Sequence, residues 1–145
     1  MLVQAILKSK ASGGVETVEP TASVSQAAKI LAEKRIGTVV ISEDGGQTAA
    51  GILSERDIVR ELAASGSGCL DKPVSNYMTK QLVTASQQDT VESILSQMTE
   101  GRFRHMPVLE DGKLVGIVTL GDAVKAQLAE LAMEKDALEG MIMGH

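Results

Sequence analysis

The sequence contains one cysteine and almost no aromatic residues. Its 145 residues include one tyrosine, one phenylalanine and no tryptophan. The single cysteine, Cys69, excludes an intrachain disulfide, and its Ser-Gly-rich surroundings hold no histidine, which is typical of an inert thiol in a reducing compartment. Because nucleic-acid bases stack on aromatic side chains, the near absence of such rings argues against DNA or RNA binding.

The sequence also lacks long apolar runs and an excess of positive charge. Stretches such as Thr38–Ile41 are far too short to span a membrane. Residues 1–7 are apolar, but the lysines follow them, whereas in a signal peptide the positive charges come first. A formal net charge of −5 argues against a surface for polyanions. We therefore expect a cytoplasmic protein that contacts neither membrane nor nucleic acid.

What the sequence does contain is an internal repeat. Apolar residues spaced i, i+3, i+4 and i+7 predict one face of a helix. This spacing occurs twice, shifted by 67 residues: Val24, Ala27, Ala28 and Leu31, then Val91, Ile94, Leu95 and Met98. The same shift relates Thr17 to Thr84, Ile36 to Phe103, and residues 43–45 to 110–112. After these turns the shift is 65, which relates Gly51 to Gly116, Ser54 to Thr119 and Asp57 to Asp122.

Each repeat has the pattern of a β-α-β-β-α unit, with an Asp-Gly turn that favours a hairpin between its second and third strands. The expected elements of the first repeat are an extended lead-in at residues 15–18, a helix at Ser23–Lys34, a strand at Thr38–Ser42 and a strand ending at Leu53. Those of the second repeat are a lead-in at residues 81–85, a helix at Thr90–Glu100, a strand at Met106–Leu109 and a strand ending at Val118. The sequence thus predicts an α/β (α+β) fold of tandem repeats with pseudo-twofold symmetry, in which small mixed sheets pack against helices.

The chain is expected to divide into a first repeat at residues 1–66, a second at 67–130 and a C-terminal helical tail at 131–145. Residues 64–68 are rich in glycine and serine, which predicts a flexible connector. The apolar residues Met141–Met143 either dock on a partner or fray. A unit of roughly 50 residues buries only a marginal core, so the two halves should pack through their strands. Their exposed helices then offer a homodimer interface.

Two segments resemble the signature of the CBS (cystathionine β-synthase) domain, which is a glycine, two apolar residues, Ser or Thr, two variable residues, Asp and an apolar residue. They are Gly51–Val59 and Gly116–Val124. Val74–Thr79 resembles the segment that commonly introduces a CBS repeat, and Arg104–Val108 resembles the family's entry to its second strand. The resemblance covers nearly the whole chain, from about Thr17 to Leu128.

The resemblance implies a paired-repeat disc, or Bateman module, with two clefts between the repeats. Such clefts commonly bind adenosine-containing ligands: AMP, ADP, ATP, NAD or S-adenosylmethionine. These modules usually regulate a partner and do not catalyse reactions themselves, and this chain is similar to the stand-alone members. We therefore expect a regulatory module that binds an adenine nucleotide, AMP before NAD or ATP, and modulates another protein.

The candidate ribose site lies at the two helix entrances. Asp57 and Asp122 match the family's ribose-binding position, where one carboxylate can accept hydrogen bonds from two vicinal hydroxyls. Ser54 and Thr119 add hydroxyls beside the free N–H groups of the helix start, which favour anions. The same Ser-x-x-Asp and Thr-x-x-Asp patterns also predict helix caps. Both roles are compatible, because a capping side chain still offers lone pairs to a ligand.

The candidate phosphate ligands are basic residues. Arg104 and His105 precede the strand that in the family approaches the cleft; arginine offers a two-pronged donor and histidine a proton that switches near neutral pH. A surface arginine beside a structural histidine is the alternative. Arg56 is the third candidate. The first repeat has Gly37-Thr38 in place of the basic pair, which predicts unequal affinities for the two clefts, or one extended ligand such as NAD across both.

Apolar contacts and backbone groups, in place of an aromatic ring, are expected to hold the adenine. Residues that match the family's base-contacting stretches are Thr17, Val18, Ile36, Gly37, Thr38 and Val39 in the first repeat, and Thr84, Ala85, Phe103 and Met106 in the second. Taken singly, each of these residues fits the hydrophobic core better than a ligand contact.

No pattern of catalytic residues supports an enzyme. The sequence has no Ser-His-Asp order around a nucleophile elbow, no GxxxxGK[ST] loop and no CxxC pair. His105 and His145 lack the spacing of metal ligands. We expect no catalytic activity and no bound metal. The competing interpretation is a structural dimerisation module whose clefts stay empty.

Overall fold

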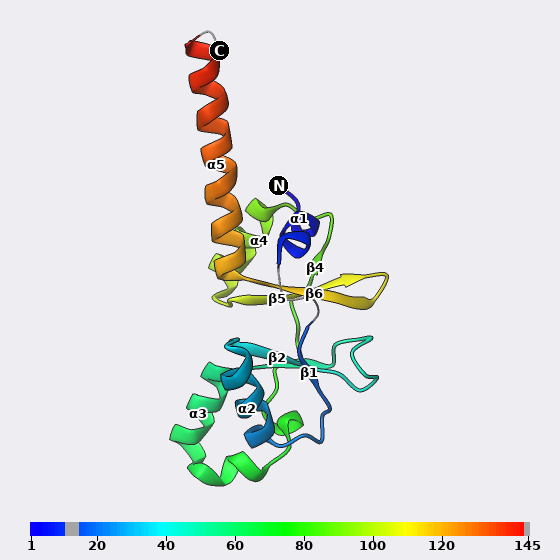
Figure 1. Cartoon of the computed structure of the whole chain (residues 1–145). Helices are drawn as coiled ribbons and strands as arrows, with labels where there is room; N and C mark the ends of the chain where they lie inside the picture. The colour runs from blue at the N-terminus through cyan, green and yellow to red at the C-terminus, as the bar shows by residue number, and fades with distance from the viewer. Residues whose placement is uncertain (11–14, 144–145) are drawn as a thin grey trace.

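The computed structural model describes residues 1–10 and 15–143, and it contains the β-α-β-β-α unit twice (Figure 1). The first repeat consists of β1 (Thr17–Val18), α2 (Val24–Lys34), β2 (Thr38–Ile41), β3 (Gly51–Ser54) and α3 (Glu55–Ser65). The second consists of β4 (Ala85–Ser86), α4 (Val91–Gly101), β5 (His105–Glu110), β6 (Lys113–Thr119) and α5 (Leu120–Ile142). The predicted fold class is therefore confirmed.

Each repeat forms a three-stranded mixed sheet. β1 runs parallel to β2, which pairs antiparallel with β3; β4, β5 and β6 repeat this arrangement. Thr38 lies opposite Ser54, and His105 lies opposite Thr119. In both repeats, therefore, the first residue of the middle strand is placed beside the residue that caps the following helix.

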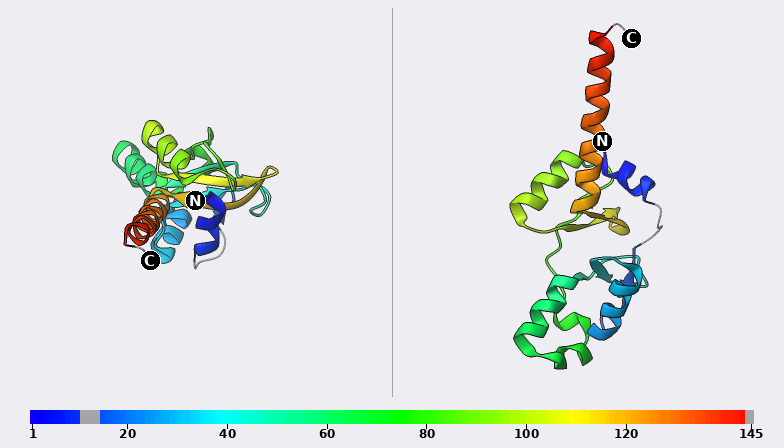
Figure 2. Two further views of the ribbon diagram at one scale, coloured as in Figure 1. Left: turned by 90° about the horizontal axis from the view of Figure 1, so that it is seen from above. Right: turned by 60° about the vertical axis from the view of Figure 1, so that its left-hand side comes forward.

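The two sheets face each other across the waist of the molecule, and the helices lie outside (Figures 1 and 2). The second repeat's hairpin contacts the first repeat's loop, where the Leu114 N–H donates to the Gln47 carbonyl at 2.8 Å and Lys113 Nζ donates to Gln47 Oε1 at 3.3 Å. The predicted pseudo-twofold packing through the strands follows from this arrangement.

The turns within the two hairpins differ in length. This difference accounts for the change in the offset between the repeats from 67 residues before the turns to 65 after them. Asp111 and Gly112 have φ of 51° and 77° and alone separate β5 from β6. Positive φ at both central residues is the turn that matches the twist of a hairpin. In the first repeat, residues 42–50 form a wider loop, in which Ser42 Oγ and Thr48 Oγ1 each donate to the Asp44 carboxylate at 2.7 Å.

The segment that leads into each repeat packs on the core of the other repeat. Helix α1 (Val3–Ser9) buries Val3 and Ile6 in the second repeat's core, which also contains Ile94, Met106 and Val118. The 3-10 helices η1 (Ser67–Asp71) and η2 (Val74–Asn76) precede the second repeat, yet Val74 is buried in the first repeat's core. The division into residues 1–66, 67–130 and 131–145 describes the repeats along the sequence and stays a prediction. In the folded chain, the segment that leads into each repeat packs on the other repeat.

The backbone hydrogen bonds of the two leading segments repeat as well. The Val3 N–H donates to the Asp89 carbonyl at 2.9 Å, and the Val74 N–H donates to the Ala22 carbonyl at 2.8 Å. Ala22 and Asp89 occupy equivalent positions, each directly before the residue that caps the repeat's first helix. The exchange is therefore symmetrical, and each half needs the other for a complete core.

One prediction about a connecting segment is corrected by the structure. Residues 64–68 are not a flexible connector: α3 continues to Ser65, Gly66 ends it at a φ of 75°, and η1 begins at once and buries Cys69. At the other end, α5 runs unbroken through Gly140 to Ile142, so most of the predicted tail is helical. Within the described residues, no helix is both long and apolar enough to cross a membrane.

Candidate functional site

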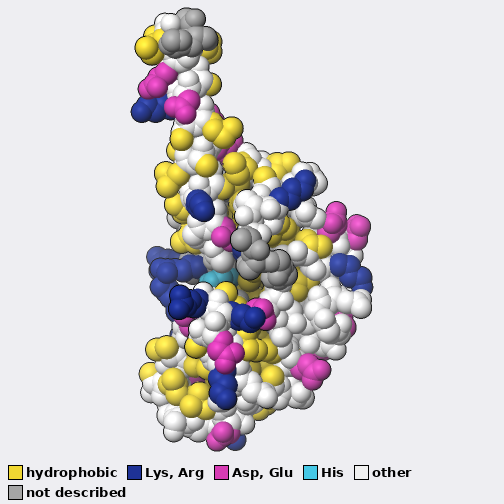
Figure 3. Space-filling model, viewed as in Figure 1, with side chains coloured by type: hydrophobic (Ala, Val, Ile, Leu, Met, Phe, Trp, Pro, Cys, Tyr) yellow, Lys and Arg dark blue, Asp and Glu magenta, His cyan; other side chains and the backbone are white. Residues whose placement is uncertain are grey.

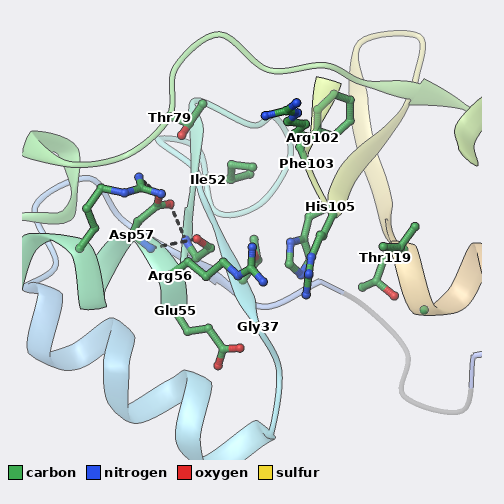
Figure 4. A pocket seen from close by; sticks show the side chains of 16 residues that line it. Gly37, Ile52, Glu55, Arg56, Asp57, Thr79, Arg102, Phe103, His105 and Thr119 are labelled. Atoms are coloured by element: carbon green, nitrogen blue, oxygen red, sulfur yellow. Dashed lines mark hydrogen bonds and ion pairs between the residues drawn. The ribbon is translucent and has the colours of Figure 1, made fainter. Parts of the chain in front are cut away.

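A pocket of about 450 Å³ opens between the two repeats, at the end of the sheets where the middle strands begin. This volume is within the usual range for a small-molecule site. The pocket is lined in the first repeat by Gly37, Thr38, Ile52, Ser54, Glu55, Arg56, Asp57 and Arg60, then by Thr79, and in the second repeat by Arg102, Phe103, Arg104, His105, Thr119, Leu120 and Gly121. Figure 4 shows Asp57 and Arg56 on one side, with Phe103 and His105 on the other.

Ser54 and Asp57 form a capping box at the start of α3. The Ser54 N–H donates to Asp57 Oδ2 at 2.9 Å, and the Asp57 N–H donates to Ser54 Oγ at 3.1 Å. Arg60 Nη1 donates to Asp57 Oδ1 at 3.2 Å from the next turn of the helix. The capping alternative is thus confirmed. Because each carboxylate oxygen has a second lone pair, Asp57 retains the capacity to accept from a ligand.

Four arginines surround the pocket, against only two carboxylates, Glu55 and Asp57. Arg56 and Arg60 come from the first turns of α3, whereas Arg102 and Arg104 lie just before β5 on the opposite side. In the space-filling view, Lys and Arg side chains gather around the histidine at the waist (Figure 3). This local positive charge lies on a chain of net charge −5, so it is suited to an anionic group.

His105 packs across the waist against Gly37 of the first repeat. A Cβ at Gly37 would lie 3.2 Å from His105 Nε2, which is too close for comfortable contact. Burial lowers the pKa of His105, and the nearby Glu55 carboxylate only partly opposes this effect. The ring is therefore mainly neutral at pH 7 and offers one donor and one acceptor. The difference in sequence between the repeats at this position therefore has a steric consequence, since a side chain at position 37 would require the imidazole of His105 to shift.

The second helix entrance has the same cap but a different partner. The Thr119 N–H donates to Asp122 Oδ2 at 3.0 Å, and Lys10 Nζ donates to the same Oδ2 at 2.9 Å and to the Ile117 carbonyl. Burial by itself raises the pKa of Asp122, but the hydrogen bonds and charge of Lys10 and the Thr119 N–H outweigh it, so the pKa is lowered on balance. Asp122 does not line the pocket. Its carboxylate is already neutralised by Lys10.

Only three of the residues predicted to contact adenine line the pocket. Gly37, Thr38 and Phe103 line the pocket. Val39 and Met106 are completely buried in the cores. The others do not line the pocket either: Val18 and Ala85 are buried, Thr17 and Ile36 are half-buried, and Thr84 is exposed.

Thr38 is the pocket residue with an unmet hydrogen-bonding need. The residue is 6% exposed, and its Oγ1 has no hydrogen-bond partner among the described residues. A buried hydroxyl without a partner costs free energy.

Sequence reasoning missed several lining residues. Arg60 lies one turn after Asp57 on the same helix, so its spacing was a usable signal. Arg102 ends α4 in the left-handed conformation with φ of 56°, as Arg35 ends α2 with φ of 54°. That repetition was visible in the sequence, but its approach to the pocket depends on tertiary packing. His145, the other histidine, lies outside the described residues.

Comparison with known proteins agrees with this architecture. A family model described as the CBS domain matches residues 11–64 and 74–129. The CBS-domain protein CBSX3, mitochondrial, of Arabidopsis thaliana is 33% identical over 125 residues, covering 84% of this chain and 61% of the plant protein, so the chain spans less than two thirds of that relative. A CBS-domain protein of Agrobacterium tumefaciens is 40% identical, with a TM-score of 0.82 over 88% of this chain and 99% of that chain.

Two similar solved structures contain adenosine compounds. A CBS domain protein from Pyrobaculum aerophilum, complexed with AMP, is 27% identical with a TM-score of 0.78, covering 92% of this chain and 99% of that chain. The CBS domain pair of protein MJ0100, in complex with 5′-methylthioadenosine and S-adenosylmethionine, is 28% identical with a TM-score of 0.77, covering 90% and 98%. From the matched repeats and their shared fold, this chain belongs to the CBS domain family and carries two CBS repeats.

Proposed function

We propose that this chain is a regulatory module that binds an adenine nucleotide, with AMP as the first candidate, and modulates a partner protein. The observation that carries the proposal is the pocket between the repeats, where a helix-entry carboxylate faces a cluster of arginines. Structures of the family that contain AMP or S-adenosylmethionine support an adenosine compound as the ligand class.

The pocket offers a partner for each part of a nucleotide. The Asp57 carboxylate accepts from the ribose hydroxyls, and Ser54 lies beside it at the same helix entrance. The phosphate meets the arginines, above all Arg104 and Arg56, and the positive end of α3. The adenine contacts Phe103, and the unpaired Thr38 hydroxyl hydrogen-bonds to its ring edge.

Charge distinguishes the candidate ligands. AMP, ADP and ATP carry phosphates, whereas 5′-methylthioadenosine has none and S-adenosylmethionine carries a sulfonium cation. Four arginines against two carboxylates favour the phosphorylated ligands. NAD is less favoured, since a second ribose would meet Asp122 in its pair with Lys10. The same pair supports unequal affinities of the two helix entrances.

The ligand is tested by thermal shift and calorimetry with AMP, ADP, ATP, NAD, S-adenosylmethionine and unphosphorylated adenosine. AMP at a hundredfold excess over its Kd should stabilise the protein by about 2.7 kcal/mol. Adenosine should bind more weakly because it lacks the phosphate. Calorimetry should give one strong site per chain. Two equal and independent AMP sites would contradict the asymmetry of the helix entrances.

A structural dimerisation module is the second candidate. The observation in its favour is that both helix-entry turns are complete capping boxes, in which the Ser54 and Thr119 N–H groups and the two aspartate carboxylates are already paired. If no adenosine compound shifts the unfolding temperature, this function replaces the first. Regulation of a partner protein is a separate test, made by affinity capture with and without AMP. The recovery of a regulated partner should change with the nucleotide.

Replacing Thr38 with valine should separate ligand binding from stability. Valine has nearly the same volume but no hydroxyl, so the ligand-free protein should be as stable as before or slightly more stable, because an unpaired buried hydroxyl disappears. AMP affinity should fall about three- to tenfold through the lost hydrogen bond. Denaturant unfolding and calorimetry measure the two effects. A loss of stability with unchanged affinity would show that the hydroxyl serves the fold.

A further inference from the structure

Helix α5 carries an exposed apolar stripe that the rest of the described chain leaves uncovered. Its members are Val124, Leu128, Leu131, Leu138 and Ile142, which are 42%, 62%, 50%, 57% and 76% exposed. The helix projects well beyond the rest of the molecule (Figures 1 and 2), and hydrophobic side chains follow it in the space-filling view (Figure 3). Large exposed apolar stripes of this kind mark interaction sites.

A different face of α5 attaches the helix to the body. Ala123 and Ala126 are buried in the second repeat's core, and Glu130 Oε1 forms an ion pair with the N-terminal ammonium group of Met1 at 2.9 Å. At 100° per residue, these positions lie about 100° to 160° from the centre of the stripe. The base of α5 is thus held in place while its stripe stays accessible.

The stripe has the spacing of a coiled coil. When Lys135 is counted with the five apolar residues, the positions from Val124 to Ile142 advance by 4, 3, 4, 3 and 4 residues. This is the alternation of d and a positions in a heptad. The one polar position in the series is Lys135, at an a position, where a lysine specifies register and pairing. Residues 124–142 span about 27 Å at 1.5 Å per residue.

We infer that α5 pairs with α5 of a second copy of this chain as an antiparallel coiled coil. A parallel pair would place Lys135 against Lys135 of the partner subunit in the core. It would also set Glu134, at g, against Glu139 of the partner subunit, at e, on both sides. Like charges at these positions oppose association.

The antiparallel pair removes most of these conflicts. Leu128 packs against Leu138 of the partner subunit, and Lys135 lies against Leu131 of the partner subunit, where its methylene stem contributes apolar contact. Lys125 faces Glu139 of the partner subunit, and the twofold axis makes this ion pair twice. The one like-charged contact left is Glu134 with its own symmetry mate. The two bodies then lie at opposite ends of the helix pair and do not compete for space.

The stripe is tested by comparing Leu131→Lys with Met133→Lys. Both side chains are exposed, at 50% and 66%, but Met133 lies outside the stripe, at an f position. Sedimentation velocity should show a dimer for the natural protein and for Met133→Lys, and a monomer for Leu131→Lys, whose Kd should rise at least about a hundredfold. AMP binding should be unchanged in all three proteins. A monomeric natural protein, or a dimer that persists in Leu131→Lys, would overturn the inference.

The orientation is tested by exchanging charges. In the antiparallel pair Lys125→Glu and Glu139→Lys should each weaken the dimer about tenfold, and the double variant should restore it. Restoration by the double variant is the decisive result. Glu139→Lys by itself also removes the ion pair that Glu139 forms with Lys135 of its own helix at 3.8 Å, so its effect alone does not report on the partner subunit. In a parallel pair Lys125→Glu should have no effect and Glu139→Lys should strengthen the dimer. That outcome would reject the antiparallel arrangement.

Discussion

Asp57→Asn is expected to weaken AMP binding about 10- to 100-fold, because hydrogen bonds to a charged acceptor are worth about 1.5–3 kcal/mol. The Asp57 carboxylate lines the pocket and retains lone pairs after capping Ser54 and pairing with Arg60. Asparagine keeps the size of the side chain but replaces one acceptor oxygen with a donor, so it cannot accept from both ribose hydroxyls. Isothermal titration calorimetry with AMP measures the change.

Asp122→Asn is the matched control for this variant. The two aspartates occupy equivalent caps, but Asp122 lies outside the pocket and is paired with Lys10 at 2.9 Å. We expect its replacement to leave AMP affinity within about twofold while costing stability through the lost ion pair. Since a cap contributes about 1 kcal/mol, the ligand-free stability of each variant must serve as its baseline. Equal losses of affinity in both variants would contradict the single asymmetric site.

Ile6→Ala is expected to destabilise the protein by about 2–5 kcal/mol, the usual cost of truncating a buried isoleucine. Ile6 is 3% exposed and lies in the core of the second repeat, although it precedes the first repeat in the chain. The loss is a large fraction of the 5–15 kcal/mol that holds a typical domain together. Urea denaturation followed by circular dichroism provides the measurement.

Lys8→Ala, on the exposed side of the same helix, is the control for Ile6→Ala. A surface substitution of this kind should change stability by less than about 0.5 kcal/mol. If the two variants unfolded at the same urea concentration, helix α1 would not be part of the second repeat's core. A further check is amide exchange, which in Ile6→Ala should accelerate in α4 and β5, the elements that this core joins.

The asymmetry of the pocket arises from symmetric packing of two repeats with different residues. The twofold arrangement brings position 37 of one repeat against position 105 of the other. Glycine at 37 leaves room for the imidazole, and arginine at the equivalent position 104 supplies charge to the pocket. One pair of substitutions between otherwise similar repeats is therefore enough to make the two helix entrances chemically different.

The sequence by itself determined the repeat, the order of its elements and the helix caps at Ser54 and Thr119. These features depend on residues within a few positions of each other: apolar periodicity defines a helix face, and a capping side chain bonds to an N–H three residues away. The CBS resemblance relied on the same local patterns. For this reason the fold class could be predicted before any contact between distant residues was known.

Only the tertiary structure decided which of the predicted site residues share a pocket. Asp57 and Asp122 look equivalent in the sequence, but Lys10 pairs with just one of them, across 112 positions of the chain. Val39 and Thr38 are neighbours, yet the first is sealed in the core and the second lines the pocket. The exchange of leading segments and the approach of Arg102 are likewise products of packing. Such contacts depend on how the two halves dock, and no local pattern of residues encodes that geometry.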